Sequence, residues 1–395
     1  MRLRGEVFCP DGSFASHLKK INHMEEKMEI TNLTFIVTDE CNFNCSYCMQ
    51  KKEKKTISYN IIRTAVDFFY PFLKSSDKIL IGFYGGEPLL AFDKIKYTVL
   101  LIKEKNKIEN KHIGFTLTTN GSLLTGEMLE FFNTHGFALQ LSFDGLAQEK
   151  SREKGSLART LQVMKRIQSR PGISFEINSV FSPDTAGDFF DSLRFIIEQK
   201  GPDITFNFSS MENWLPAHLE TLTNELERLV DYLALYYRKS GRIPVKNFQA
   251  QDSRQGISRC SAGLNHIAVT PEGKLWGCFL FHYYFKSRED DPQYAEYSFG
   301  DLNDFIKDYK TRYPGIMVNY SGLRQDFYYV EEEGRDCFLC PELQTCKVCP
   351  VNAAYTTGSL GKIPGRKCKL MKIEKNAGNL LNNILKVKNN VPEFP

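Results

Sequence analysis

Three cysteines that lie within eight residues are the most informative feature of this 395-residue chain. They are Cys41, Cys45 and Cys48, spaced C-x3-C-x2-C, and they follow the apolar run Leu33–Val37. Three neighbouring thiols cannot pair among themselves without leaving one over, but a loop at a strand end can fold them round a soft metal centre. Thiolates select iron–sulfur clusters, zinc or Cu(I). On a four-iron cluster, three protein ligands leave one iron open to another molecule.

The composition narrows the class of protein. The chain has 51 Lys and Arg against 47 Asp and Glu, a formal net charge of +4, which gives no argument for a nucleic-acid or membrane partner. It has no apolar run near the ~20 residues of a membrane helix and no secretory h-region, so we expect a cytoplasmic protein. Cytoplasmic thiols stay reduced, and metal binding therefore accounts for eleven cysteines better than disulfides do.

Short β-rich runs alternate with helical runs from residue 31 onward. Strands are expected at Leu33–Val37, Ile79–Tyr84, Gly114–Thr119, Ala138–Phe143, Ser174–Val180 and Ile204–Phe208. Helices are expected at Ile61–Leu73, Phe92–Lys105, Thr125–Asn133, Leu157–Ser169 and Asp188–Lys200. This alternation predicts an α/β fold with a parallel sheet, and six βα units make an open, partial (β/α)6 barrel of TIM type. Chemistry in such folds sits at the carboxyl ends of the strands.

The amino-acid composition of the chain changes after a further predicted helix at residues 221–240. A polar stretch with Pro244 follows, and seven of the eleven cysteines then fall between Cys260 and Cys368. We therefore expect three parts: an N-terminal arm at residues 1–30, the barrel at 31–241, and a small cysteine-rich domain at 242–395.

A second motif, Gly85-Gly86-Glu87-Pro88, follows the second predicted strand. Two glycines permit close backbone approach, and Glu87 can accept a hydrogen bond from an ammonium group. Without the cysteines, the same four residues would be interpreted as an ordinary turn. The third and fourth strands end in Thr118-Thr119-Asn120-Gly121 and Ser142-Phe143-Asp144-Gly145.

The cysteine spacing, with Tyr47 before the last cysteine and Gly-Gly-Glu-Pro one βα unit later, resembles the radical S-adenosylmethionine (SAM) superfamily. The resemblance implies that the three cysteines hold a [4Fe–4S] cluster whose open iron binds the methionine part of SAM. Reductive cleavage would then give a 5′-deoxyadenosyl radical that takes hydrogen from a substrate. The cofactor contacts that it implies are Tyr47, Gly85, Gly86, Glu87, Thr118, Asn120, Ser142, Arg152 and Ser179.

Arg152 is expected to bind the SAM carboxylate as a bidentate partner. It belongs to the segment Gln148-Glu149-Lys150-Ser151-Arg152, where peptide-modifying relatives often have His-Asp-x-x-Arg, and the arginine alone matches.

The later cysteines resemble the SPASM extension, which carries two auxiliary iron–sulfur clusters. Their spacing is Cys260-x12-Gly273-x4-Cys278, Cys337-x2-Cys340-x5-Cys346-x2-Cys349 and then Cys368. The resemblance assigns Cys260, Cys278 and Cys349 to the first auxiliary cluster. It assigns Cys337, Cys340, Cys346 and Cys368 to the second. The x2 before Cys349 departs from the usual x3.

The first auxiliary block is expected to form a hairpin of Ile267–Thr270 and Lys274–Trp276. With three protein ligands, the first auxiliary cluster could be completed by a substrate thiolate, His266 or His282. Zinc is the alternative, but the two C-x2-C pairs are five residues apart, whereas zinc ribbons separate theirs by about 15–20.

Enzymes with this pairing of domains mostly act on peptides or proteins, which leaves three classes open. They are a peptide maturase that forms thioether or carbon–carbon cross-links, an anaerobic sulfatase-maturating enzyme that makes formylglycine, and a non-catalytic Fe–S or zinc scaffold. Sulfatase-maturating relatives have an Asp after the second hairpin cysteine, whereas Cys278 is followed here by Phe279, which cannot accept a proton. We therefore predict a peptide maturase with a precursor peptide as partner and a flavodoxin or ferredoxin as electron donor.

Overall fold

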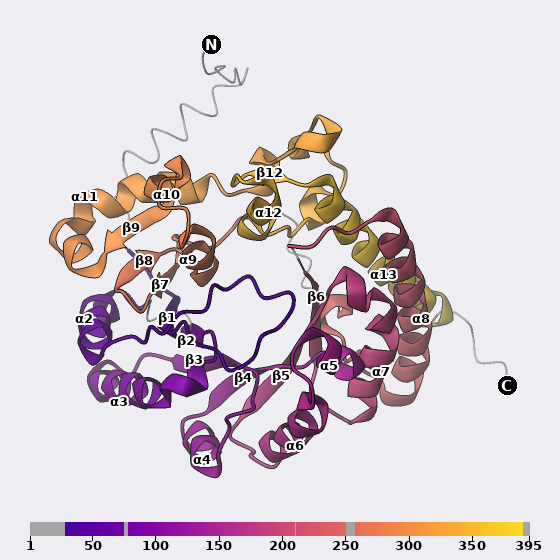
Figure 1. Cartoon of the computed structure of the whole chain (residues 1–395), viewed down its shortest axis with the longest axis horizontal. Coiled ribbons are helices and arrows are strands. Elements are labelled where there is room, and N and C mark those ends of the chain that lie inside the picture. Colours follow the sequence, from indigo (N-terminus) through magenta and orange to yellow (C-terminus); the bar gives the residue numbers. More distant parts are fainter. Residues whose placement is uncertain (1–27, 75–77, 210, 250–256, 390–395) are drawn as a thin grey trace.

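The computed structural model describes residues 28–74, 78–209, 211–249 and 257–389, so most of the expected arm and Cys9 lie outside it. Figure 1 shows a curved sheet with helices around its outer side. The strand order is β6-β5-β4-β3-β2-β1-β7-β8-β9, and β1 to β6 are parallel. The barrel strands are β1 (Asn32–Thr38), β2 (Ile79–Gly85), β3 (Ile113–Thr119), β4 (Phe137–Ser142), β5 (Ser174–Phe181) and β6 (Ile204–Phe208).

The predicted parallel, partial barrel is confirmed. The helices that follow its strands are α2 (Tyr59–Phe69), α3 (Phe92–Glu109), α4 (Gly126–Thr134), α5 (Gln148–Ser151), α6 (Ser156–Gln168), α7 (Phe189–Glu198) and α8 (Pro216–Ser240). The first of them ends earlier than the predicted Leu73, because Pro71 lacks an amide donor and the chain passes into a 3-10 turn. The last begins earlier than residue 221, with Pro216 in its first turn.

Alternation along the strands gives the sheet two different faces. The face under the helices is apolar and aromatic: the ring centroids of Phe35 and Phe83 lie 6.4 Å apart, and those of Phe83 and Phe137 lie 6.0 Å apart. The concave face instead carries Thr, Asn and Gln side chains at alternate positions. The sequence therefore builds the core outside the barrel wall and leaves the inside polar.

The cysteine-rich region continues the same sheet. Strand β7 (His266–Val269) pairs in parallel with β1, and β8 (Lys274–Trp276) and β9 (Ser298–Asp301) add antiparallel strands. The predicted hairpin is therefore present as β7 and β8. Three further strands, β10 (Tyr329–Val330), β11 (Arg335–Asp336) and β12 (Lys362–Ile363), form a small second sheet. The domain boundary at residue 242 stays a prediction.

Helices complete this region. They are α9 (Phe279–Phe285), α10 (Pro292–Tyr297), α11 (Leu302–Ser321), α12 (Pro350–Thr357) and α13 (Gly365–Asn389). Figure 1 shows α13 beside α8, at the end of the sheet where the barrel is open. Asn247 bonds both backbone groups of Phe206 on the edge strand β6, and its Nδ2 donates to Glu374 Oε1 of α13 at 2.8 Å. The C-terminal helix is thereby fixed to the open edge.

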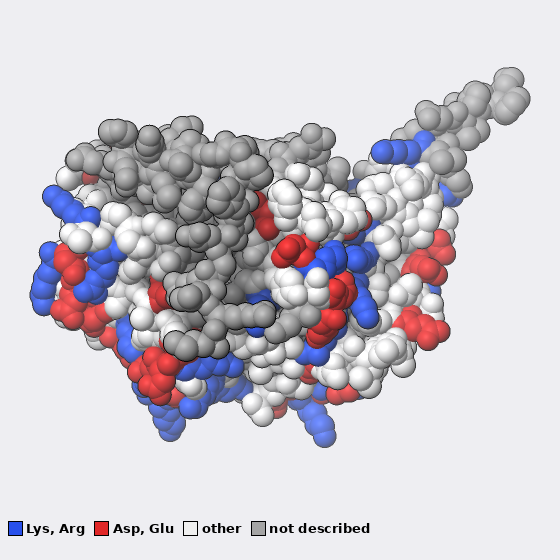
Figure 2. All heavy atoms as spheres, turned by 90° about the horizontal axis from the view of Figure 1, so that it is seen from above, with Lys and Arg blue, Asp and Glu red and all other residues white. Residues whose placement is uncertain are grey.

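Figure 2 shows the surface of the molecule turned by 90° from the view of Figure 1. On the described part of this face, Lys and Arg are interspersed with Asp and Glu. This mixture agrees with the nearly balanced charge of the sequence. In the described ranges, no helix is both long and apolar enough to cross a membrane.

Candidate active site

A cavity of about 810 Å³ lies on the concave side of the sheet and reaches the carboxyl ends of its strands. It brings together residues from segments that are more than a hundred positions apart in the chain. The predicted site residues that line it are Cys41, Cys45, Tyr47, Cys48, Gly85, Gly86, Glu87, Thr118, Asn120, Ser142, Arg152 and Cys349.

The loop that carries Cys41, Cys45 and Cys48 is called the cysteine loop. The two glycines of the Gly-Gly-Glu-Pro motif let the end of β2 pack directly on the start of this loop. A Cβ on Gly86 would lie 2.1 Å from the Glu40 carbonyl oxygen, and one on Gly85 would lie 2.3 Å from that of Thr38. The Gly86 amide donates to the Thr38 carbonyl at 2.9 Å, and the Glu87 amide donates to the Glu40 carbonyl at 2.7 Å. These glycines therefore position the cysteine loop.

The Glu87 carboxylate is buried and already bonded. Oε1 accepts from the Leu89 amide at 3.1 Å and the Thr119 hydroxyl at 2.7 Å, and Oε2 accepts from the Asn120 amide at 2.8 Å. Burial raises the pKa of Glu87 to about 7, against the lowering effect of these bonds. The carboxylate joins the ends of β2 and β3, and its expected contact with an ammonium group stays a prediction.

Asp144, which is not among the site residues expected from the sequence, is the centre of a buried network. Its Oδ2 accepts from the Tyr47 hydroxyl at 2.8 Å, the Ser151 hydroxyl at 2.7 Å and Arg152 Nε at 2.8 Å. Its Oδ1 accepts from Arg152 Nη2 at 2.9 Å and the Val180 amide at 2.9 Å. The network ties the cysteine loop, through Tyr47, to the ends of β4 and β5. An acidic residue directly after a predicted strand was the available signal.

Arg152 Nε and Nη2 both donate to Asp144. The expected bidentate contact of this guanidinium with the SAM carboxylate stays a prediction. The guanidinium carbon lies 5.3 Å from the centre of the Tyr47 ring. Arg152 still lines the cavity and contributes positive charge to its wall.

Ser179 does not line the cavity, and its expected contact with SAM stays a prediction. Its side chain is fully buried, and its hydroxyl donates to the Phe143 carbonyl at 2.7 Å. Side chains alternate along β5, so Asn178 and Val180 face the cavity instead.

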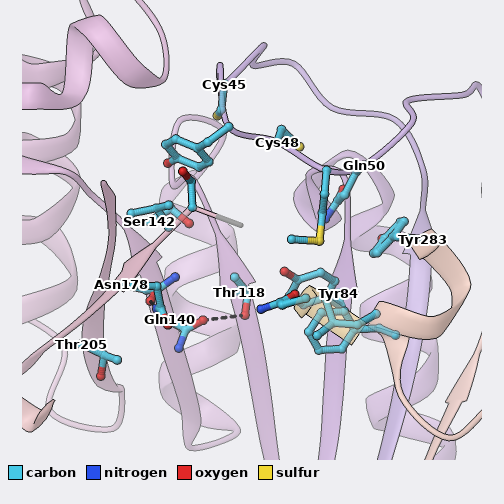
Figure 3. A pocket seen from close by; sticks show the side chains of 18 of the residues that line it. Cys45, Cys48, Gln50, Tyr84, Thr118, Gln140, Ser142, Asn178, Thr205 and Tyr283 are labelled. Atoms are coloured by element: carbon cyan, nitrogen blue, oxygen red, sulfur yellow. Dashed lines mark hydrogen bonds between the residues drawn. The ribbon is translucent and has the colours of Figure 1, made fainter. Parts of the chain in front are cut away.

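A belt of neutral polar side chains lines the barrel below the cysteine loop. In Figure 3, Gln140, Asn178 and Thr205 lie below Cys45, and a dashed line joins Thr118 to Gln140. The Thr118 hydroxyl donates to Gln140 Oε1 at 3.3 Å, and Asn207 Nδ2 donates to Asn178 Oδ1 at 2.8 Å. Such groups bind uncharged polar partners, peptide bonds among them. The alternation of polar and apolar residues in these strands could have revealed the belt.

The other side of the cavity is aromatic. Tyr84, at the end of β2, stacks on Phe279 of α9 with ring centroids 3.9 Å apart, and Tyr283 lies beside Tyr84 in Figure 3. Burial raises the pKa of Tyr84, and the neighbouring Cys48 and Cys278 thiols raise it further. The cavity thus has one polar side and one apolar side.

The cysteine loop is also anchored by charge. Asp39, Glu272 and His282 lie close enough together for one metal ion, the one such group among the described residues. However, Lys286 Nζ lies 2.6 Å from Asp39 Oδ2, and Lys55 Nζ lies 3.0 Å from Glu272 Oε1. Two lysines already neutralise these carboxylates, so the group is an ion-pair network that holds the end of β1 to the hairpin turn and to α9.

The remaining cysteines gather in two groups. The thiols of Cys260, Cys278 and Cys349 lie close together: burial raises the pKa of Cys260 and of Cys278, and the neighbouring Cys349 thiol raises both further. A separate group around the small second sheet consists of Cys337, Cys340, Cys346 and Cys368. These are the sets that the resemblance assigned to the two auxiliary clusters, and their role as ligands stays a prediction. His266 lines the same cavity as Cys349, with its Nε2 3.0 Å from the Thr34 hydroxyl, and His282 faces Asp39. The completion of the first auxiliary cluster by either histidine stays a prediction.

The spacing of the sulfur atoms bears on which metal fits. Tetrahedral zinc requires its four thiolates within about 4 Å of one another, and the described cysteines do not gather that closely. A [4Fe–4S] cluster accepts wider spacing because each cysteine binds a different iron. Burial raises the pKa of Cys41 and of Cys260 to about 11 each, so metal binding there would release protons. The binding of iron–sulfur clusters rather than zinc by these cysteines stays a prediction.

Residues 35–196 match the Radical SAM superfamily. The matched range begins in β1 and ends in α7. It therefore contains the cysteine loop, the Gly-Gly-Glu-Pro motif and the buried network around Asp144.

In sequence, the chain is similar to the radical SAM cyclopropyl synthase TigE of Paramaledivibacter caminithermalis, with 24% identity over 310 residues. The alignment covers 70% of this chain and 64% of TigE, so the chain spans less than two thirds of that relative. It is also similar to GTP 3′,8-cyclase of Clostridium perfringens, with 28% identity over 65% of this chain and 82% of the cyclase.

In structure, the chain is similar to anSMEcpe with bound AdoMet and Cp18Cys peptide, with a TM-score of 0.69 and 17% identity over 92% of this chain and all of that one. It is similar to Streptococcus suis SuiB bound to its precursor peptide SuiA, with a TM-score of 0.56 and 18% identity over 93% and 83% of the two chains. At these identities the likeness shows a shared fold, and it extends over the cysteine-rich region.

Proposed function

We propose that this chain, which carries a radical SAM domain at residues 35–196, modifies a precursor peptide by installing a thioether or carbon–carbon cross-link. One observation carries the proposal. The cavity that contains the three cysteines of the loop is also lined by Phe279 and Cys349 of the cysteine-rich region. A substrate in this cavity therefore meets both predicted cluster regions at once.

In this proposal Cys41, Cys45 and Cys48 hold a [4Fe–4S] cluster that, with SAM, supplies a 5′-deoxyadenosyl radical when bound. The protein's own residues do the positioning. Gly85 and Gly86 fix the loop by close backbone packing, and the Asp144 network holds Tyr47 against the strand ends. The amide belt and the aromatic wall then orient a peptide between them.

A peptide suits the two sides of the cavity. The belt offers hydrogen bonds to backbone amides, and the wall formed by Tyr84, Phe279 and Tyr283 accepts an apolar side chain. Two proteins of similar fold bind peptides in their structures, anSMEcpe with Cp18Cys and SuiB with SuiA. TigE, a relative in sequence, is named as a cyclopropyl synthase.

Sulfatase maturation is the second candidate, because anSMEcpe, a sulfatase maturase, shares this fold. That chemistry uses an Asp after the second hairpin cysteine, and here Phe279 occupies the position. Phe279 stacks on Tyr84 and leaves no carboxylate at that wall. The observation favours cross-linking over formylglycine formation.

The cysteine-rich region is proposed to hold two auxiliary [4Fe–4S] clusters, one in each group of cysteines. Together with the SAM cluster, this gives about three clusters per chain. The clusters would carry the surplus electron away from the cavity, and a flavodoxin or ferredoxin would supply electrons for SAM cleavage.

Coexpression tests the proposal. The chain is produced anaerobically with each small open reading frame encoded beside its gene, and the peptides are analysed by mass spectrometry. A cross-link removes the mass of two hydrogen atoms, and fragmentation locates it. Conversion of a Cys or Ser to formylglycine would favour the sulfatase-maturase alternative. Peptides of unchanged mass would contradict the proposal, and a Cys45→Ala variant serves as the inactive control.

A further inference from the structure

The proposed cross-linking reaction must release a proton, and Phe279 cannot accept it. When a carbon radical on the peptide bonds to a thiol of the same peptide, one proton and one electron leave. The electron requires a one-electron acceptor of the iron–sulfur class. The proton requires a base in the cavity, and the assignment of that base rests on the proposed function.

Among the described residues, two carboxylates line the cavity, Glu87 and Glu374. Glu87 already accepts three hydrogen bonds, from the Leu89 amide, the Thr119 hydroxyl and the Asn120 amide. Removing this carboxylate from its partners would separate the ends of β2 and β3. Glu374 is the carboxylate that remains available to a substrate.

Glu374 projects into the cavity from one face of α13. Lys367, Leu370, Met371 and Glu374 all line the cavity, and their i, i+3, i+4, i+7 spacing places them on one side of the helix. Glu374 Oε1 accepts a hydrogen bond from Asn247 Nδ2 at 2.8 Å, which fixes the carboxylate against the edge strand β6. The open side of the barrel is therefore closed by a helix that carries a carboxylate inward.

The surroundings of Glu374 suit a base. Burial raises the pKa of its carboxyl group, and the Asn247 amide and the Lys367 charge offset part of that shift. A carboxylate with a raised pKa holds an accepted proton better than a solvated one. The two apolar neighbours on α13, Leu370 and Met371, are buried or half-buried and limit access of water.

We propose that the Glu374 carboxylate accepts the proton released when the cross-link forms. With SAM bound, a peptide C–H bond would give up its hydrogen atom to the radical that the cofactor supplies. The peptide carbon would then bond to the sulfur of a peptide S–H group. The S–H proton goes to Glu374, and the one surplus electron would go to an iron–sulfur group held by the cysteines.

The test uses Glu374→Gln, Glu374→Asp and the control Glu227→Gln, which removes an exposed carboxylate from the neighbouring helix α8. Gln keeps the Oε1 acceptor for Asn247 but cannot take a proton. The probe is the neighbouring-gene peptide that the wild-type enzyme modifies, labelled for binding by fluorescence anisotropy. Iron content, peptide Kd, 5′-deoxyadenosine and cross-linked peptide are measured for each variant.

If Glu374 is the base, Glu374→Gln should keep its iron and still form 5′-deoxyadenosine. It should bind the peptide with a Kd within about threefold of that of the wild type. Cross-linking falls by about 10²–10⁴-fold, Glu374→Asp recovers part of it, and Glu227→Gln matches wild type. Cross-linking at the wild-type rate in Glu374→Gln overturns the inference. Loss of peptide binding or of iron in that variant also overturns it, because Glu374 would then act as an anchor or a structural group. A wild-type enzyme that modifies no peptide fails the proposed function itself.

Discussion

Tyr84 and Phe279 stack face to face with ring centroids 3.9 Å apart, although they lie at the end of the second barrel strand and directly after a cysteine of the C-terminal region. Burial raises the pKa of the Tyr84 hydroxyl group, and Tyr84 lies close enough to both Cys48 and Cys278 for their thiols to raise it further. The pair therefore connects the cysteine loop with the first group of later cysteines. Through this contact, the barrel and the cysteine-rich region share one cavity wall.

Gly86→Ala should displace the cysteine loop. The new methyl group would meet the Glu40 carbonyl oxygen at 2.1 Å, and neither backbone can move without breaking the bonds between them. We expect a loss of stability on the order of 3 kcal/mol and a reduced iron content. Chemical denaturation and iron analysis measure both. Gly126→Ala is the matched control, since a Cβ there meets no atom within 4 Å; equal losses in both variants would refute the packing argument.

Asp144→Asn should destabilise the protein strongly. It would leave the buried Arg152 guanidinium without a counter-charge, a change that costs about 3–5 kcal/mol in buried pairs. Asp188→Asn breaks the exposed pair with Lys150, at 3.3 Å, and should cost at most about 1 kcal/mol. Urea unfolding of the two variants gives the comparison. A cost for Asp144→Asn no larger than for Asp188→Asn would show that the buried network does not hold the site.

His266 should make stability depend on pH. Burial lowers its pKa to about 4, whereas an unfolded histidine titrates near about 6.5. As the pH falls below about 6.5 the unfolded chain gains a proton that the folded chain does not bind, so stability is present above that pH and lost below it. Between about pH 7.5 and about pH 5, wild type should lose about 1–2 kcal/mol more than His266→Gln. The exposed His112→Gln should behave like wild type, and identical pH profiles for wild type and His266→Gln would contradict the expectation.

The iron content of cysteine variants should distinguish the predicted clusters from one another. Cys45→Ala should remove the iron of the SAM cluster and abolish 5′-deoxyadenosine formation. Cys337→Ala should lower the iron content by about four atoms per chain, because it acts on the second auxiliary group. Cys9→Ala, which changes a cysteine outside every predicted ligand set, should keep the full iron content. Stoichiometric zinc without iron in the wild-type protein would contradict all of these expectations.

Much of the fold and part of the site could be predicted because the signals are local. The spacing of Cys41, Cys45 and Cys48, and the Gly-Gly-Glu-Pro turn, each lie within a few residues, and βα alternation places both at strand ends. On β5, Asn178 and Val180 face the cavity and Ser179 does not. Successive side chains of a strand point to opposite faces, and the short polar segment around Ser179 does not show which face is turned inward.

Contacts that form only in the folded chain could not be predicted from the sequence pattern. Asp144 and Arg152 are eight residues apart, and they pair because the loop after β4 folds back. Glu374 reaches the cavity from a helix that packs beside β6, some 170 residues earlier in the chain. No periodicity within α13 indicates which strand it will cover.

The transfer of hydrogen from a peptide tests the central claim most directly. The reconstituted enzyme is given SAM, a reductant and the neighbouring-gene peptide deuterated at the side-chain carbon that becomes cross-linked. The account predicts 5′-deoxyadenosine that carries deuterium, together with the cross-linked peptide. Unlabelled 5′-deoxyadenosine beside an unmodified peptide would contradict it.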